Sequence, residues 1–459
     1  MHFWLIAACL MLSPFLLGCP PQPAPKPEPK SESKPRSEPA KPGGARRGAE
    51  GSVVFLHPDG MSVAHWDAVR LINVGPDGHL AWDRLPHVAI YRAHPRGGLA
   101  MTSNAGATIH AYGVKATRRS FGREPDREIT AASGKSLSVM MEAKQRGMAT
   151  GLVQSAALTD PGTAVFMARA TDRDHHDRIA AQLVVSGVDV MLGGGERYLL
   201  PRGVAGRFGP GERGDGRDLI AEAKKRGYTV VYTREELLAL SGPRKVLGVF
   251  AHGHTFNDGS EEALAAKKLP RYVPGAPTIG EMVQAALRLL SARGRRFLLV
   301  GEEEGTDNYS NYGNAAGFLE AGKHADDAVA VVRRFIDGNP DTLLIVASDS
   351  NANGLQIGVT PRYAGDTASG ALAPRAGNGC PADGVGGSGT AAFTSGPDRD
   401  GRRYPFSIIW GTDDDTLGDM VVRAGGLNAR LLHGTVDNTA VYTLMYYTLF
   451  GRCLGELCR

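Results

Sequence analysis

The sequence predicts an α/β fold in which helices cover both faces of a mostly parallel central sheet. From residue 51 to residue 459, short apolar and β-branched runs alternate with longer helical patterns, which is typical of parallel strands joined by helices. Glycine accounts for 60 of the 459 residues, well above a usual share of about 7%, and this indicates many tight turns. Hydrophobic residues at 42% and charged residues at 22% exclude a wholly disordered chain.

The expected strands are seven short runs rich in apolar and β-branched residues. They are Ser52–His57, Thr150–Gln154, Val188–Leu192, Val246–Ala251, Phe297–Gly301, Thr342–Ala347 and Phe406–Trp410. Helical periodicity is clearest over residues 174–186, 217–226, 277–292, 323–337 and 435–450. In folds of this kind the functional residues lie beyond the carboxyl ends of the strands.

The N-terminal segment is expected to direct export. Residues 3–18 form an apolar run that is short for a membrane span and typical of a secretory signal. The run ends in Leu16-Leu17-Gly18-Cys19, which resembles the lipobox of bacterial lipoproteins. That resemblance implies a lipid anchor at Cys19 in the bacterial cell envelope, periplasmic or surface-facing. An ordinary cleaved signal with an incidental cysteine is the alternative.

A tether is expected between the signal peptide (residues 1–19) and one folded domain (residues 51–459). Residues 20–50 contain nine prolines and no large apolar residue, so they cannot bury a core and should be disordered and extended. They also carry seven Lys/Arg against four Asp/Glu, which is +3 of the net charge of +4. The nearly neutral remainder argues against nucleic acid as a partner. Near the C-terminus, Cys453 and Cys458 are close enough in sequence to pair.

Acidic residues follow three of the expected strands. Asp59 comes after the strand at 52–57, Glu302 and Asp307 after 297–301, and Asp349 after 342–347. Crowded carboxylates repel one another unless a cation compensates them. The three strand ends together therefore predict a cluster of divalent metals held by oxygen ligands, although any single Asp could instead cap a helix.

A candidate nucleophile lies at the start of a helix made of small residues, Thr102–Thr108. Ser103 would occupy its first turn, where free backbone N–H groups and the helix dipole favour a phosphate. A serine hydroxyl beside a metal ion loses its proton more easily and becomes a competent nucleophile. Taken alone, Ser103 would be interpreted as a helix cap.

Together, the order and spacing of the motifs resemble those of the alkaline phosphatase family over nearly all of residues 51–459. The similar segments are Val53–Met61, Ser103–Lys115, Thr159–Phe166, Ser186–Gly195, Leu247–Ala251 and Val436–Thr439. The resemblance implies that Ser103 is the nucleophile, that Arg173 clamps the phosphate, and that the ligands of two zinc sites and one magnesium site lie nearby. The positions that correspond to metal ligands are Asp59, Asp160, Glu302, Asp307, Asn311, Asp349, Ser350 and Asp400.

This sequence departs from the family at each zinc-binding histidine. The three histidines are replaced by Asn311, Ser350 and Asp400, with Asp398 as an alternative to Asp400, and Gly162 replaces a small hydroxyl ligand. Zinc favours nitrogen and sulfur ligands, whereas magnesium, calcium and manganese favour oxygen. We therefore expect an enzyme that uses these harder cations. The alternative is a site that has lost its activity.

The resulting functional hypothesis is an exported, metal-dependent phosphomonoesterase that acts on a small phosphate ester through a phosphoserine at Ser103. A phosphodiesterase or sulfatase on the same scaffold, and a non-catalytic lipid-anchored metal- or phosphate-binding protein, are the alternatives. The resemblance leaves a homodimer open. His252 and His254 are interpreted as loop residues, and Trp66 as a core residue. Glu303 and Glu304 compete with Glu302, and only the spacing to Asp307 favours Glu302.

Overall fold

The computed structural model describes residues 49–455 and 457, apart from 360–374, 377, 386, 387 and 389. The strands are β1 Ser52–Pro58, β2 His87–Arg92, β3 Ala149–Ala157, β4 Val190–Gly194, β5 Tyr228–Val231, β6 Lys245–Val249, β7 Phe297–Glu303, β8 Thr342–Val346, β9 Gln356–Gly358, β10 Ala382–Asp383, β11 Phe393–Thr394, β12 Pro405–Ile409, β13 Val421–Gly426 and β14 Thr435–Asp437. The expected signal peptide, Cys19, most of the tether and Cys458 lie outside the described residues.

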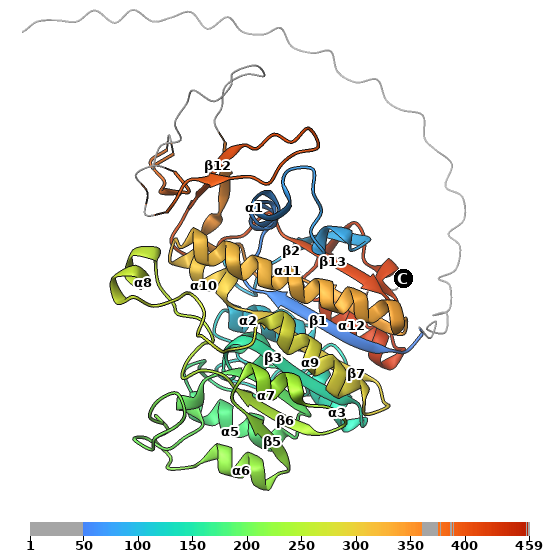
Figure 1. Cartoon of the computed structure of the whole chain (residues 1–459). Helices are drawn as coiled ribbons and strands as arrows, with labels where there is room; N and C mark the ends of the chain where they lie inside the picture. The colour runs from blue at the N-terminus through green and yellow to red at the C-terminus, as the bar shows by residue number, and fades with distance from the viewer. Residues whose placement is uncertain are drawn as a thin grey trace, which may run out of the picture. The chain divides into compact units, whose positions relative to one another are not determined.

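Ten of these strands form one sheet in the order β14-β2-β13-β8-β1-β7-β3-β4-β6-β5 (Figure 1). Within it, β13 runs antiparallel to both of its neighbours. The other described pairs of this sheet are parallel. The expected α/β fold with a mostly parallel sheet is therefore confirmed.

The α-helices connect the strands and cover the sheet. They are α1 Val63–Val74, α2 Ser103–Tyr112, α3 Val139–Gln145, α4 Pro161–Ala164, α5 His176–Ser186, α6 Leu219–Lys225, α7 Arg234–Ala239, α8 Glu261–Lys267, α9 Ile279–Ser291, α10 Gly305–Asn311, α11 Ala315–Gly338 and α12 Ala440–Phe450. None of the described helices has both the length and the apolar character needed to span a membrane.

Strand β1 shows why both faces of the sheet must be covered. Val53 and Phe55 pack into one hydrophobic core, and Val54 and Leu56 pack into the other. Successive side chains of a strand point to opposite faces, so a run of apolar residues needs helices on each side. Helices α9 and α11 pack on the face of Val54 and Leu56 (Figure 1), and α12 packs on the face of Val53 and Phe55.

The structure corrects the sequence-based expectations at two places. The run Phe406–Trp410 was expected in the central sheet, but β12 belongs to a small antiparallel sheet with β9, β10 and β11. The segment 435–450 was expected to be one helix, but its first residues pair with β2 as β14, and α12 begins at Ala440. In both cases the apolar pattern is compatible with either location, and pairing with distant residues decides between them.

Candidate active site

Four neighbouring strands, β8-β1-β7-β3, deliver acidic residues to the same edge of the sheet. Asp349 follows β8, and Asp59 follows β1 directly. Glu302 is the last residue but one of β7, and Asp160 follows β3 by three residues. These strands are parallel, so their carboxyl ends meet. The side chains of Asp59, Glu302 and Asp349 are buried.

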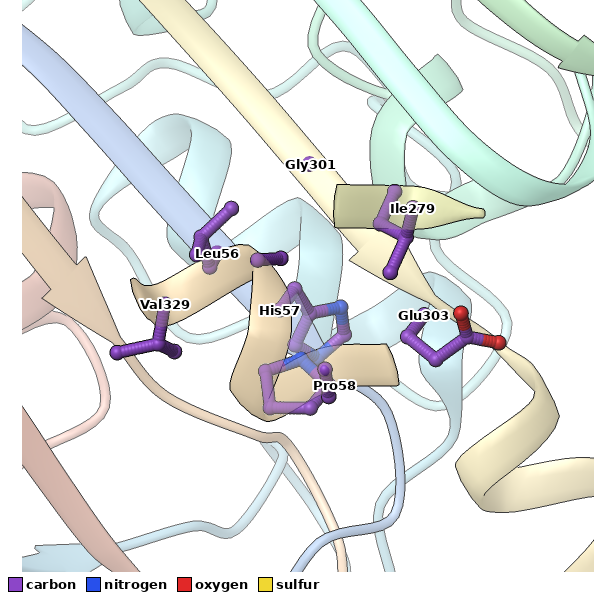
Figure 2. Close-up of a pocket in the computed structure, with 9 residues that line it drawn as sticks. Leu56, His57, Pro58, Ile279, Gly301, Glu303 and Val329 are labelled. Atoms are coloured by element: carbon purple, nitrogen blue, oxygen red, sulfur yellow. The ribbon is translucent and has the colours of Figure 1, made fainter. Parts of the chain in front are cut away.

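The alternation of side chains along β7 separates the three consecutive glutamates. Glu302 pairs in register with His57 of β1, and Glu303 pairs with Pro58. Glu303 accepts hydrogen bonds from Ser155 and Tyr272, and its carboxylate points away from the His57 ring (Figure 2). Glu304 instead lies with Glu302 and Asp59, and carboxylate oxygens of these three residues fall within 4.8 Å of one another. The structure therefore brings Glu302 and Glu304 to the cluster.

The small pocket drawn in Figure 2 lies on the side of the sheet that α9 and α11 cover. Leu56, Ile279 and Val329 contribute to its mostly apolar lining, and Glu303 is its acidic residue. His57 also lines this pocket, but its ring contacts Phe55 and His110 and lies among the carboxylates of the cluster. Because Glu303 is already held by neutral donors of the protein, we assign this pocket no part in the chemistry.

The carboxyl groups of the cluster have raised pKa values, as expected where negative charges are buried close together. Burial, followed by the charge of Asp349, raises the pKa of Asp59 to about 8. Burial likewise raises the pKa of Glu302 to about 8, with the charges of Asp59 and Asp160 adding to the effect. Burial and neighbouring carboxylates also raise the pKa values of Glu304 and Asp307 well above their usual range. Carboxyl groups behave in this way when they are buried together without a cation.

Orphaned oxygen atoms support the same conclusion. Asp59 Oδ2, Glu302 Oε2, Glu304 Oε2, Asp307 Oδ1 and both carboxylate oxygens of Asp349 are buried without a hydrogen-bond partner. An unpaired buried polar atom is destabilising, and an oxygen-ligated divalent cation would satisfy all of these atoms. The residues present therefore fit a metal centre.

A second group of acidic residues surrounds Asn311, which follows Asp307 by one turn of α10. The Asn311 Nδ2 atom donates to Asp307 Oδ2 at 2.9 Å and to Asp415 Oδ1 at 3.3 Å. Asp415 was absent from the sequence-based ligand set. It reaches the site because the backbone of Thr416 pairs with that of Asn351, two residues after Asp349. Burial and the charge of Asp59 raise the pKa of Asp415 to about 6.

Asp400 does not join this group, and its expected role as a ligand is corrected here. It lies in the exposed turn between β11 and β12, where its carboxylate forms an ion pair with Arg402 at 3.6 Å and remains 62% exposed. Asp398, the alternative, accepts hydrogen bonds from the backbone of Arg402 and from the Tyr404 hydroxyl in the same turn. The loop that approaches the cluster is instead the one that carries Asp415. Ser350 is buried, and its hydroxyl has no hydrogen-bond partner among the described residues.

Ser103 is the first residue of α2, as the sequence predicts. Its side chain is buried, and its interaction with the carboxylate of Asp59 lowers the pKa of that carboxylate. Helix α2 is fixed by Asn104, which donates to the carbonyl oxygens of Arg118 and Ser120. One turn further along α2, Gly106 lies against Asp349, so the nucleophile candidate lies beside the carboxylate cluster.

Arg173 lies beside Asp160, with 3.7 Å between Nη2 and Oδ1. Burial alone would lower the pKa of Arg173, but the negative charges of Asp160 and Glu304 outweigh this effect, so the pKa lies above its usual value. The guanidinium stays half-exposed, so its donors remain available to an anion that approaches the cluster.

Gly162, where the family resemblance implies a hydroxyl ligand, lies directly against Glu302. A Cβ atom at this position would collide with the carboxylate of Glu302. The space that a threonine would need is therefore occupied by an acidic side chain.

His57 is the residue that the sequence analysis overlooked. The expectation of a cluster without imidazole is wrong, because the buried His57 ring lies among the carboxylates and its Nδ1 atom is 3.1 Å from Glu302 Oε1. The available signal was the two-residue period of β1, which places Phe55, His57 and Asp59 on one face.

Two other expectations agree with the structure: Trp66 stacks on Trp82 in the core, and His252 contacts the carbonyl oxygen of Pro210 in a loop.

Comparisons with known proteins agree with this geometry. The sequence model of the family described as Alkaline phosphatase matches residues 51–450. The chain is 30% identical to streptomycin-6-phosphate phosphatase of Streptomyces griseus over 338 residues, which cover 65% of this chain and 73% of that protein. It is 26% identical to the tissue-nonspecific alkaline phosphatase of Rattus norvegicus, with 89% of this chain and 84% of that protein covered.

Solved structures give the same picture. The crystal structure of Thermus thermophilus alkaline phosphatase superposes with a TM-score of 0.66 at 26% identity, and the match covers 89% of this chain and 94% of that one. Alkaline phosphatase from the Antarctic bacterium TAB5 superposes with a TM-score of 0.65 at 17% identity, with 88% and 99% of the two chains covered.

Proposed function

The chain belongs to the alkaline phosphatase family and is a phosphoric monoester hydrolase, and we propose that its catalysis passes through a phosphoserine at Ser103. The observation that supports this most directly is the position of Ser103 at the start of α2, a helix whose first turns lie against Asp349 of the carboxylate cluster. An anionic phosphate is favoured at that position by the free N–H groups and the dipole of the helix.

Ser103 would attack the phosphorus atom in line with the ester oxygen. A bond forms between Oγ and phosphorus, the serine proton passes to water, the ester bond breaks, and the alcohol leaves with a proton taken up from water. Water then attacks the phosphoserine, gives one proton back to Ser103 Oγ and releases phosphate, which restores the Ser103 hydroxyl. The start of α2, whose next turn lies against Asp349, would hold the oxygen in position for both steps.

Arg173 would bind two non-bridging oxygens of the phosphate. A planar guanidinium is suited to such bidentate contact. The ion pair with Asp160 holds the side chain at the rim of the cluster, and its partial exposure leaves donors for the substrate.

Divalent cations fit the carboxylates, and we propose Asp59, Asp160, Glu302, Glu304, Asp307, Asp349 and Asp415 as the acidic residues that hold them, with Asn311 as a further oxygen donor. Ions bound there would offset the negative charge, favour the deprotonated serine and stabilise the departing oxygen. Asn311 presents its amide nitrogen to the two carboxylates, and a half-turn of the amide group would present the oxygen instead. The ligands around Asp307 are then all oxygens, which favours magnesium, calcium or manganese.

A reconstitution experiment tests the reaction. Chelated protein is supplied with one divalent metal at a time, and hydrolysis of a chromogenic phosphate monoester is measured beside a phosphodiester, a sulfate ester and streptomycin 6-phosphate. We expect the monoester to be hydrolysed and Ser103→Ala to abolish the reaction while metal content is retained. A variant that keeps more than about a tenth of the activity would exclude Ser103, because a tenfold loss is only about 1.4 kcal/mol of barrier. Preferential cleavage of the diester or the sulfate would replace the monoester proposal.

We also propose that the protein is exported and anchored through a lipid on Cys19, as its Leu16–Cys19 segment suggests. Cys19→Ser should then release the protein from the membrane fraction, and a variant that stays bound would exclude this anchor. Self-association as a homodimer, which the family resemblance suggests, is testable by sedimentation of the protein without residues 1–48.

A further inference from the structure

The ring of His57 is held in one orientation by its neighbours. Its Nδ1 atom is 3.1 Å from Glu302 Oε1, and the side chain is fully buried. The ring stacks on Phe55 and meets the ring of His110 from α2 edge-on, with centroids 5.5 Å apart. His110 in turn is hydrogen-bonded to the hydroxyl of Tyr91. Packing therefore fixes the direction in which the other ring nitrogen points.

The contact with Glu302 favours one tautomer when a metal ion is bound. An ionised Glu302 accepts a hydrogen bond, so the proton of a neutral His57 then lies on Nδ1, and Nε2 carries a lone pair. Nε2 is buried and has no hydrogen-bond partner. A carboxylate that orients a histidine through one nitrogen, while the other nitrogen binds a metal, is a recurrent arrangement in metal sites.

The free nitrogen faces two carboxylates at distances that suit ligands of a shared ion. Nε2 is 3.6 Å from Asp349 Oδ1 and 3.9 Å from Asp59 Oδ1, too far for a hydrogen bond. In a tetrahedral zinc site with bonds of about 2.0–2.2 Å, two ligand atoms lie about 3.3–3.6 Å apart. Ligand atoms of His57, Asp59 and Asp349 all fall within 4.8 Å of one another, so a small contraction would complete the site.

We propose that His57, Asp59 and Asp349 form a mixed nitrogen–oxygen metal site, in which His57 is a metal ligand and makes this one position of the cluster selective for zinc over magnesium. Imidazole suits zinc, whereas magnesium prefers oxygen. The neighbouring ligands around Asp307 contain no imidazole, so the two parts of the cluster would prefer different ions. This inference rests on the proposed function only in that it takes the cluster to be a metal centre.

A competing role for His57 predicts the opposite result. A protonated imidazole would itself balance the charge of Asp59, Asp349 and Glu302 and so occupy the place of a cation. Removing a ligand lowers zinc affinity, whereas removing a built-in positive charge raises the affinity for every divalent cation. The two roles are therefore distinguished by whether zinc affinity falls or rises when His57 is replaced.

The experiment measures the binding of Zn²⁺ and of Mg²⁺ alone to the chelated protein, without any substrate, in the unmodified chain and in His57→Gln. His324→Gln is the matched control, because it also removes a partly buried imidazole, but one that packs on Tyr272 and lies outside the ligand group. We expect His57→Gln to weaken zinc binding at least about tenfold, the smallest loss found even when only a partner of a ligand is removed. Magnesium affinity should change by less than about threefold, and His324→Gln should keep both affinities.

Unchanged or stronger zinc binding by His57→Gln would overturn the proposal, and so would an equal loss in His324→Gln. If His57→Gln does not fold, X-ray absorption of the zinc-loaded unmodified protein decides, because an imidazole shell supports the proposal and an oxygen-only shell overturns it. Failure to hydrolyse any phosphate ester would count against the proposed function alone, since neither measurement depends on turnover.

Discussion

At the scale of single residues, the site combines a proposed nucleophile, a proposed phosphate-binding arginine and a set of carboxylates that repel one another. Ser103 begins α2 beside the cluster, and Arg173 lies beside Asp160. The proposed roles predict different consequences for the two substitutions, since Ser103 would make the covalent bond and Arg173 would only hold the phosphate.

Arg173→Ala is expected to weaken inhibition by inorganic phosphate while leaving slower but measurable turnover. A hydrogen bond to a charged group contributes about 1.5–3 kcal/mol, so the inhibition constant should rise by about ten- to hundredfold. Arg178→Ala, on the exposed face of α5, is the control and should leave the constant unchanged. Unaltered phosphate inhibition in Arg173→Ala would remove this arginine from the site.

Histidine substitutions should show whether Asp415 or Asp400 lies at the metal site. Because Asn311 contacts Asp415 and Asp400 lies in an exposed turn, Asn311→His combined with Asp415→His should raise zinc affinity. Asn311→His combined with Asp400→His should bind zinc no better than Asn311→His alone. Zinc titration against a competing indicator measures both variants. A gain that comes from Asp400→His would show that the wrong loop has been assigned.

At the scale of elements, the site depends on how closely α2 approaches the loop after β8. Gly106, one turn into α2, faces Asp349, and a Cβ atom there would lie 2.6 Å from Asp349 Oδ2. The absence of a side chain at Gly106 therefore lets the helix that carries Ser103 lie directly against a metal-ligand candidate.

Gly106→Ala is expected to displace α2 from Asp349 and reduce turnover at least about tenfold, because small misplacements of a reacting group are costly. Gly338→Ala is the control, since a Cβ atom at that residue of α11 meets no atom within 4 Å. Chemical denaturation should show that both variants remain folded. If Gly106→Ala retains full activity, the close approach of α2 has no role in positioning Ser103.

At the scale of the whole molecule, the cluster couples metal binding to stability. Asp59 and Glu302 have pKa values of about 8 in the folded protein, far above the about 3.9–4.3 of an unfolded chain. Between those values the folded state holds protons that the unfolded state has lost. His57, whose pKa the surrounding carboxylates raise despite burial, acts in the same direction above about pH 6.5.

The metal-free protein should therefore lose stability as the pH rises from about 5 to about 8, by at most about 1.4 kcal/mol per pH unit for each such group. The ionisation of Asp349 does not oppose this loss of stability. Burial would raise its pKa, but its interactions with the neighbouring Asp59 and with the nearby imidazole of His57 lower it, so its contribution is lost only in more acidic solution. Urea unfolding of chelated protein measures the trend, and divalent metal should flatten it. Stability that is constant or rises over this range would contradict the carboxylate assignment.

The sequence by itself determined the α/β fold and most of the central strands, because a strand buried on both faces must be apolar throughout. It also determined that Asp59, Glu302 and Asp349 meet, since parallel neighbours end at one edge, and that Ser103 begins a helix. The order of the motifs was sufficient to identify the family. All of these conclusions depend on local patterns and on a general property of parallel sheets.

Only the tertiary structure decided which further residues join the cluster. Asp415 was selected over Asp400 by the pairing of Thr416 with Asn351, a contact between segments that local sequence does not connect. Glu303 was separated from Glu302 and Glu304 by the register of β7 against β1. His57 was brought among the carboxylates by that same register and by packing against α2. The physical reason is that the direction of a side chain at a strand end, and the path of the loop beyond it, depend on what packs against them.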